Sequence, residues 1–170
     1  VNSLNRFKDV DVIINALNLL HIKKSNFHLL IIGDGLLKND LEKQSKQLSL
    51  EDNITFIGSI SNPLPYLKIA DIFVLASNKE NFSNALLEAM ACSLPVIVSN
   101  VGGNKEVIKH LENGLRFQVG SHDDLSKKIH FLFNNEKSSK LIGENARKTI
   151  MEKYTLEQTF YEYEKIYNLD

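Results

Sequence analysis

Short apolar runs alternate along the chain with longer segments in which apolar residues recur every three or four positions. The short runs predict strands, most of them buried on both faces, and they span 1–4, 27–33, 53–60, 71–77, 94–100 and 114–119. The segments with helical spacing span 9–24, 36–48, 62–70, 83–92, 104–110, 123–134, 136–152 and 155–168. This alternation predicts an α/β fold: a doubly wound parallel sheet with helices on both faces.

A single domain accounts for the whole chain. No repeat, low-complexity tract or Pro/Gly-rich linker interrupts the 170 residues, and that length suffices for a substantial hydrophobic core. The opening residues, VNSL, look like the end of a strand whose start is missing, so we expect the chain to be a piece of a longer protein. A doubly wound sheet binds its ligands at the carboxyl ends of its strands, where the strand order reverses.

The composition narrows the range of partners and compartments. A net charge of -1 gives no basis for a nucleic acid or an anionic membrane as a bulk partner. The single cysteine, Cys92, excludes an internal disulfide and fits a reducing compartment. No apolar run approaches the roughly 20 residues that span a bilayer, and no signal peptide is visible. We therefore expect a cytoplasmic protein.

Two glutamates stand out around the predicted helix 83–92. From Ala85 to Cys92 every side chain is apolar except Glu88, and a helix that is apolar around most of its circumference is typical of a core position. A lone carboxylate in such surroundings costs several kcal/mol unless a partner or ligand compensates its charge. A second carboxylate, Glu80, lies on the loop just before the helix.

The start of this predicted helix offers free backbone donors. The amides of Phe82, Ser83 and Asn84 precede the first intrahelical hydrogen bonds, and such groups attract phosphate. A nucleoside diphosphate sugar fits this layout, with its pyrophosphate at the amides, its ribose on Glu88 and its sugar on Glu80. The residues alone leave another interpretation open, in which Glu80 is a solvated loop residue and Glu88 pairs with a nearby lysine or caps a loop.

The stretch ENFSNALLEAMACSLPVIVSNVGGNKEVI resembles the signature of the large family of retaining glycosyltransferases called group 1, or family 4. That signature reads approximately EGFGxxLLEAMAxGxPVIxxxxGGxxEII, and the two glutamates, the glycine pair and the following Glu106 match it in spacing. The resemblance extends to four further segments: LNRFKDVDVIINAL, HLLIIGDGLLKNDLEKQSKQLSLEDNITFIGSI, ENGLRFQVGSHDDLSKKI and EKYTLEQTFYEYEKIY. It therefore covers the whole chain in the family's order.

The resemblance implies one half of the GT-B fold, in which two Rossmann-like domains face each other across a cleft. This chain resembles the C-terminal, nucleotide-sugar-binding domain over residues 1–170, and the N-terminal acceptor domain is missing. The implied reaction transfers a hexosyl or N-acetylhexosaminyl group from a UDP- or GDP-sugar to an acceptor glycan or lipid, with retention at the anomeric carbon. No metal or other cofactor is expected, and the isolated domain is expected to be inactive.

Residue roles also follow from the resemblance. Glu80 would bind hydroxyls of the donor sugar, and Lys8 would neutralise the pyrophosphate as the glycosidic bond breaks. The backbone at 82–84 would bind the distal phosphate and Glu88 the ribose. Gly58 falls where the chain passes the nucleobase. Without the resemblance, Lys8 would be interpreted as a solvated lysine at a helix start.

Four residues depart from the signature, and two of them, Ser3 and Asn81, motivate alternatives. Ser3 replaces the usual arginine ahead of the lysine, and Arg6 is the nearby charge that could substitute for it. Asn81 stands where the signature has a glycine, in a turn that asparagine tolerates because it adopts positive φ more readily than other non-glycine residues. Ser83 and Ser93 replace two further glycines of the signature. One alternative is a degenerate, non-catalytic nucleotide-sugar-binding domain; a less favoured one is a UDP-sugar epimerase of the same fold.

Other signals favour structural roles. The GDG sequence after residue 32 lacks the third glycine of a dinucleotide fingerprint, because Lys38 occupies that position. The five histidines show no metal-ligand spacing. The aromatic residues near the end are expected to pack the last helix against the domain; they are Tyr154, Phe160, Tyr161, Tyr163 and Tyr167. Polysaccharide synthesis, with peripheral association at the inner face of the cell membrane, is the setting that the resemblance implies.

Overall fold

Strands and helices alternate in the computed structural model, which describes residues 2–22 and 27–167. The strands are β1 (Asn2–Ser3), β2 (Leu29–Asp34), β3 (Ile54–Gly58), β4 (Phe73–Leu75), β5 (Val96–Ser99) and β6 (Leu115–Phe117). The helices are α1 (Val10–Ile22), α2 (Lys38–Gln47), α3 (Leu64–Ile69), α4 (Asn84–Ala91), α5 (Gly102–Val107), α6 (His122–Asn134), α7 (Glu136–Lys153) and α8 (Leu156–Tyr167), with a 3-10 turn at Glu51–Asn53. Each predicted strand and helix is present, with boundaries shifted by a few residues.

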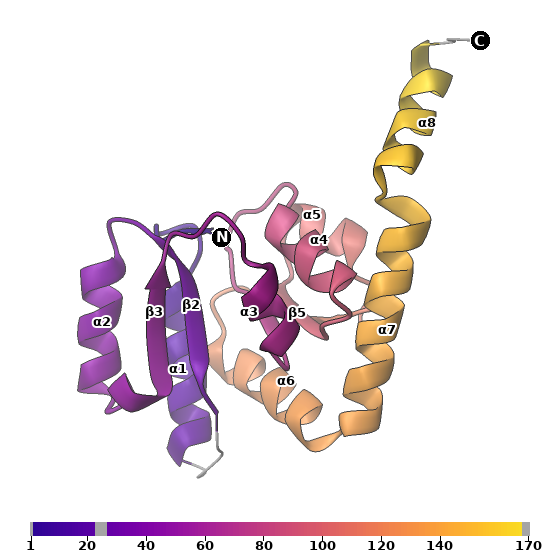
Figure 1. Ribbon diagram of the computed structural model, residues 1–170. Helices are drawn as coiled ribbons and strands as arrows, with labels where there is room; N and C mark the ends of the chain where they lie inside the picture. Colours follow the sequence, from indigo (N-terminus) through magenta and orange to yellow (C-terminus); the bar gives the residue numbers. More distant parts are fainter. Residues whose placement is uncertain (1, 23–26, 168–170) are drawn as a thin grey trace.

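Every described strand pair is parallel. Backbone hydrogen bonds join the strands in the orders β1-β2-β3 and β4-β5-β6, so two three-stranded sheets share the fold. Helices cover both faces of the strands (Figure 1). The prediction of a parallel, doubly wound α/β fold is confirmed, because apolar strands of this kind need a helical layer on each side.

The side chains of β5 alternate between two apolar clusters. Ile97 packs with residues of α1 and α6, whereas Val96 and Val98 pack with α3, α4, α5 and α7. Helix α1 also contributes Ile14 to a third cluster with Leu4, Ile31, Leu41, Leu50 and Ile54. Because α1 packs in both the first and the third cluster, it ties the two sheets together.

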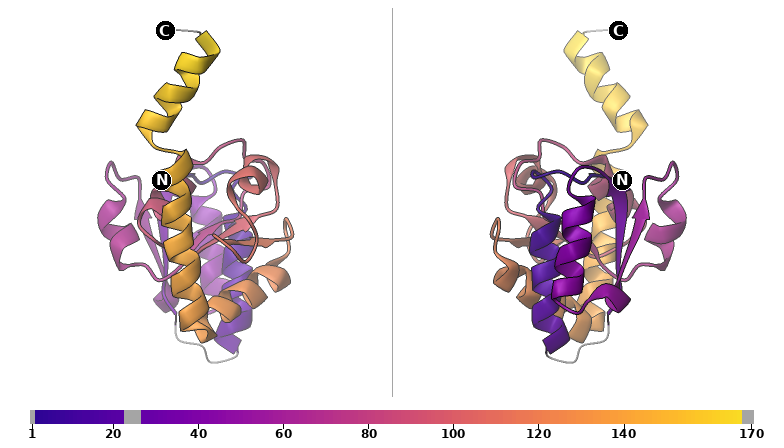
Figure 2. Two further views of the ribbon diagram at one scale, coloured as in Figure 1. Left: turned by 90° about the vertical axis from the view of Figure 1, so that its right-hand side faces the viewer. Right: turned by 90° about the vertical axis from the view of Figure 1, so that its left-hand side faces the viewer.

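The C-terminal helix extends beyond the rest of the domain. Helix α7 lies along the side of the domain, and α8 continues past it (Figures 1 and 2). Phe160 and Tyr161 are 65% and 53% exposed, so the prediction that they pack against the domain is wrong. Tyr154, at the end of α7, does contact the core cluster around α4. The side chains of Tyr163 and Tyr167 lie outside the described part of the structure.

Ser93 carries backbone strain where the family signature has a glycine. Its φ is +61°, a left-handed conformation that costs an L-residue about 1–2 kcal/mol. Glycine avoids this strain, but its unfolded chain has more conformational entropy to lose, which offsets part of the gain. We expect Ser93→Gly to stabilise the fold by about 0.5–1 kcal/mol in urea denaturation. The matched control is Ser138→Gly within α7, which should destabilise; a less stable Ser93→Gly variant would contradict the expectation.

His110, between α5 and β6, makes the folding stability depend on pH. Its Nδ1 accepts a hydrogen bond from the backbone N–H of Arg116 at 2.9 Å, which requires a neutral ring. Burial lowers the pKa of His110 below its usual 6.5, the charges of Lys128 and Arg116 lower it further, and Asp124 opposes them. The folded state therefore binds the proton more weakly than the unfolded state. Stabilisation is complete above pH 6.5 and is lost as the pH falls from there through the folded pKa.

Thermal unfolding of His110→Gln checks this expectation. Between about pH 8 and about pH 5, the variant should lose less stability than the wild type, because it lacks the His110 ring whose protonation the folded state disfavours. Equal losses would show that His110 does not carry the effect.

Candidate functional site

A lysine and a glutamate meet where the chain leaves β1 and β4. The Nζ atom of Lys8 lies 2.8 Å from Oε2 of Glu80, and the two side chains are only 19% and 11% exposed. The hydroxyl of Ser77 donates to the same Oε2 at 3.1 Å. The other carboxylate oxygen, Oε1, has no partner among the described residues. Glu80 is therefore held through one oxygen while the other stays able to accept a hydrogen bond.

Buried polar side chains hold the backbone next to Glu80. The Ser99 hydroxyl donates to the carbonyl of Ser77, and Asn104 donates to the carbonyl of Ser99 at 3.1 Å. Ser77, Ser99 and Asn104 are at most 1% exposed. The sequence analysis did not identify these three residues; the signal available was a serine at the end of two neighbouring apolar runs. Since their hydrogen bonds are satisfied within the fold, they fix the backbone from which Glu80 projects.

Two glycines at the start of α5 let the chain approach the loop that carries Glu80. The backbone N–H of Gly103 donates to the carbonyl of Glu80 at 3.1 Å. A Cβ atom on Gly102 would lie 2.4 Å from that same carbonyl oxygen, and one on Gly103 would lie 1.5 Å from the carbonyl oxygen of Asn81. The glycine pair is thus a requirement of close packing. Asn81 itself does not adopt a positive φ, so the predicted demand on its backbone does not arise.

The start of α4 presents backbone N–H groups without acceptors. Ser83 caps this helix, its hydroxyl accepting from the amide of Leu86 at 3.3 Å. The amides of Phe82, Ser83 and Asn84 donate to no other described residue, in agreement with the prediction. The ring of Phe82 is 52% exposed, and its centroid lies 5.9 Å from that of Tyr154. Free amides and a helix dipole make this end of α4 suited to an anion.

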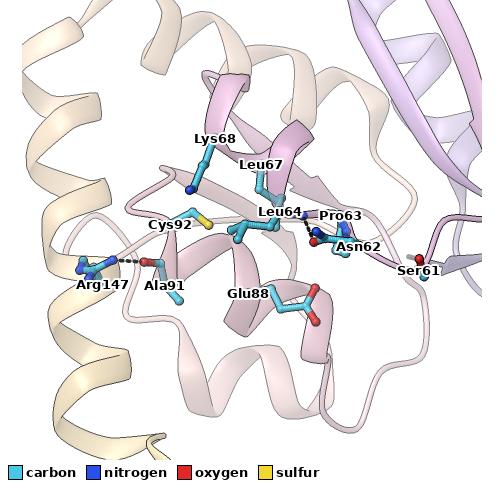
Figure 3. Close-up of a pocket in the computed structure, with 10 residues that line it drawn as sticks. All are labelled: Ser61, Asn62, Pro63, Leu64, Leu67, Lys68, Glu88, Ala91, Cys92 and Arg147. Carbon is cyan, nitrogen blue, oxygen red and sulfur yellow. Dashed lines mark hydrogen bonds between the residues drawn. The ribbon is translucent and has the colours of Figure 1, made fainter.

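Glu88 lines a pocket between α3, α4 and α7. The pocket has a volume of about 610 Å³ and is bounded by Ser61, Asn62, Pro63, Leu64, Leu67, Lys68, Glu88, Ala91, Cys92 and Arg147. Figure 3 shows Glu88 projecting from α4 on the side of residues 61–64, with Arg147 at the far end. Glu88 is exposed and forms no ion pair with a described residue, which argues against the interpretation that it pairs with a lysine. Apolar walls with a few polar groups are typical of small-molecule sites.

Glu88 is the one predicted site residue that lines this pocket, and Arg6 and Gly58 lie apart from both the pocket and the Lys8–Glu80 pair. The guanidinium of Arg6 lies 5.3 Å from the centroid of the Phe7 ring and is exposed. Gly58, at the end of β3 with a φ of +81°, precedes the first pocket residue of that loop, Ser61. The side chain of Ser3 lies outside the described part of the structure. Cys92 lies partly exposed at the pocket.

The loops after β1 and β4 bring the predicted residues together across a long sequence separation. Lys8 and Glu80 meet directly, and the acceptor-free amides of 82–84 follow Glu80 along the chain. Glu88 lies a turn further into α4, in the pocket rather than beside the ion pair. The arrangement offers one anion site, one free carboxylate oxygen and one carboxylate-lined pocket.

The family model described as glycosyl transferases group 1 matches residues 1–149. The chain belongs to this family. Among curated members, it is 32% identical over 167 residues to an N-acetyl-alpha-D-glucosaminyl L-malate synthase of Bacillus anthracis, a match that covers 98% of this chain and 44% of that protein. The group 1 chain thus spans less than half the length of this relative.

Solved structures of glycosyltransferases share the fold of this group 1 chain. A mutant of S. aureus TarM, crystallised with UDP, alpha-GlcNAc-glycerol and fondaparinux, superposes with a TM-score of 0.92 at 26% identity, over 98% of this chain and 34% of that one. The C-terminal domain of a group 1 family protein (LpcC) from Francisella tularensis gives a TM-score of 0.82 at 29% identity, over 91% of this chain and 83% of that one. The chain has the architecture of one half of a GT-B glycosyltransferase.

Among the described residues, no helix is long and apolar enough to cross a membrane.

Proposed function

We propose that this chain is the C-terminal, donor-binding domain of a retaining family 4 glycosyltransferase, and that it binds a nucleoside diphosphate sugar. The observation that carries the proposal is the Lys8–Glu80 pair beside the acceptor-free amides of α4. The match to an isolated C-terminal domain of a family member supports the assignment to that half. In such an enzyme an N-terminal domain would bind the acceptor, so this chain alone is expected not to turn over substrate.

The pyrophosphate of the donor would lie between the start of α4 and the loop after β1. The amides of Phe82, Ser83 and Asn84 would bind the distal phosphate, with the helix dipole adding to the attraction. Lys8 would compensate the charge that develops on the leaving diphosphate when the glycosidic bond breaks. This electrostatic stabilisation needs no metal or other cofactor. Arg6 would add positive charge at the edge of the site.

The two glutamates would bind opposite ends of the donor. Because Oε2 of Glu80 is held by Lys8 and Ser77, Oε1 is the atom that would accept a hydroxyl of the sugar. Glu88 would accept the ribose hydroxyls at the mouth of its pocket, and the apolar walls beyond would receive the nucleobase. The pocket begins at Ser61, so we place the base against residues 61–64 rather than at Gly58.

UDP is the first nucleotide to test. Besides TarM, a structure of Anabaena Alr3699/HepE with UDP and glucose resembles this chain with a TM-score of 0.80 at 25% identity. The curated relatives include an N-acetylgalactosaminyltransferase of Campylobacter jejuni, which is 30% identical over 148 residues. A UDP-hexose or UDP-N-acetylhexosamine is therefore the donor class we favour over a GDP-sugar. A cytoplasmic enzyme of polysaccharide synthesis, working at the inner face of the cell membrane, fits such relatives.

Calorimetric titration of this chain with UDP, GDP and their hexose conjugates tests the function. We expect a nucleotide to bind with micromolar affinity and its sugar conjugate to bind with equal or higher affinity. Uridine and inorganic phosphate serve as controls for the two halves of the ligand. Absence of binding to every nucleotide would overturn the proposal and favour the degenerate domain that Ser3 and Asn81 first suggested. Epimerisation of a UDP-sugar by the full-length protein, without transfer, would favour the epimerase.

A further inference from the structure

Asn78 fastens the segment that carries Lys8 to the end of β4. Its side-chain amide donates to the carbonyl of Arg6 at 2.9 Å and to Oδ1 of Asp9 at 2.7 Å. Its backbone N–H donates to the carbonyl of Phe7 at 2.9 Å. Asn78 alone therefore forms three hydrogen bonds, to Arg6, Phe7 and Asp9, and the last two are the residues on either side of Lys8.

The segment held in this way is not relaxed. Asp9 has a φ of +44°, in the left-handed region that costs an L-residue about 1–2 kcal/mol. Burial raises the pKa of Asp9, the Asn78 hydrogen bond lowers it, and the charge of Asp11 raises it. The hydrogen bond from Asn78 thus favours the ionised carboxylate in a place where burial and Asp11 disfavour it. Backbone strain of this kind persists only where the surroundings hold it.

Lys8 lies at the centre of this strained segment. Asn78 holds the backbone carbonyl of Phe7 on one side of Lys8 and the side-chain carboxylate of Asp9 on the other. The Lys8 side chain extends from this held segment to Glu80. Glu80 follows Asn78 by only two residues. The same short span, 78–80, therefore positions the cation and carries its carboxylate partner.

We propose that Asn78 is a positioning residue that acts on the donor diphosphate through Lys8. This inference rests on the proposed function and deepens it. Without the hydrogen bonds from Asn78, Asp9 is free to leave its left-handed conformation, and Lys8 then loses its fixed orientation. The affinity for the distal phosphate falls, while the nucleoside pocket, which lies on α3, α4 and α7, is unaffected.

The decisive measurement compares UDP with UMP, which lacks the distal phosphate. Asn78→Ala should weaken UDP binding by about tenfold and UMP binding by less than about twofold, because a charge-assisted contact contributes on this scale. A merely structural role would weaken both ligands alike. Asn39→Ala, which alters an exposed asparagine on α2, is the control and should change neither affinity.

A double-mutant cycle shows whether the effect passes through Lys8. In a Lys8→Met background, Asn78→Ala should cause no further loss of UDP affinity, because the group that it positions is already absent. Asn78→Asp keeps the volume of the side chain, loses both donated hydrogen bonds and faces Asp9. It should therefore weaken UDP binding at least as much as Asn78→Ala, and it gives a second reading if the alanine variant folds poorly.

The outcomes separate the two proposals. If the wild type binds UDP and Asn78→Ala and Asn78→Asp retain the wild-type preference for UDP over UMP, the positioning role is overturned while the donor site stands. Equal losses from Asn78→Ala in the wild-type and Lys8→Met backgrounds would overturn it as well. If the wild type binds neither UDP nor GDP, the proposed function itself fails.

Discussion

Gly103→Ala is expected to cost at least about 3 kcal/mol of folding stability and to abolish nucleotide binding. A Cβ atom at this position would lie 1.5 Å from the carbonyl oxygen of Asn81 and 2.5 Å from its carbonyl carbon. Both are backbone atoms, so no side-chain rotation relieves the clash. Either α5 or the loop 80–82 must move, and that loop carries Glu80 and leads directly to the amides at the start of α4. Urea denaturation and calorimetric titration with UDP measure the two effects.

Gly120→Ala is the matched control for this prediction. Gly120 has no neighbouring atom within 4 Å of an added Cβ and a φ of +72°, so alanine there carries backbone strain without a clash. We expect a loss of about 1 kcal/mol and unchanged UDP binding. A Gly103→Ala variant as stable as Gly120→Ala would mean that the glycine pair does not touch the Glu80 loop.

Replacing the two glutamates should give opposite patterns of binding. Glu88→Gln is expected to weaken UDP and UDP-sugar by a similar factor of about tenfold or more, because the charged acceptor for the ribose is lost. Its effect on stability should be small, since Glu88 is exposed and forms no ion pair with a described residue. Glu80→Gln should not weaken UDP binding and should remove the discrimination among sugars. Because Lys8 loses its charged partner, UDP affinity should be retained or raised.

Titration of each variant with UDP and with a panel of UDP-sugars measures these patterns. Glu136→Gln, at the exposed first residue of α7, is the control for loss of one negative charge. Wild-type affinity of Glu88→Gln for both UDP and GDP would remove Glu88 from the nucleotide site. Undiminished sugar discrimination by Glu80→Gln would remove Glu80 from the sugar site.

The apolar pattern predicted the strands well because a strand covered on both faces leaves little ambiguity. The errors lie at the strand ends, where the pattern continues but the hydrogen bonds change. The predicted strand 71–77 shortens to β4, and Ser77 and Asn78, beyond its end, bind Glu80 and the loop after β1 instead. Sequence periodicity does not indicate which polar residue at a strand end will turn toward another loop.

The candidate site was predicted only in part. The free amides at the start of the predicted helix indicated an anion site from local sequence alone, and Glu80 and Glu88 indicated hydroxyl-binding groups on either side of it. Lys8 is 72 positions from Glu80, and only the family resemblance connected them; their direct contact was not predicted. The same holds for the support of Glu80 by Ser77, because a buried serine and a solvated one look alike in sequence. The exposure of Phe160 and Tyr161 on α8 does not follow from the pattern, because aromatic residues indicate burial without showing what buries them.

The engagement of Lys8 by Glu80 before any ligand arrives bears on catalytic turnover. An ammonium group that is already paired with a carboxylate contributes less binding free energy to a diphosphate than an unpaired one, because the carboxylate partly neutralises its charge. In the proposed enzyme the spent nucleotide would accordingly dissociate sooner. Product release limits the rate of many enzymes, so a moderate affinity for the nucleotide product favours rapid turnover.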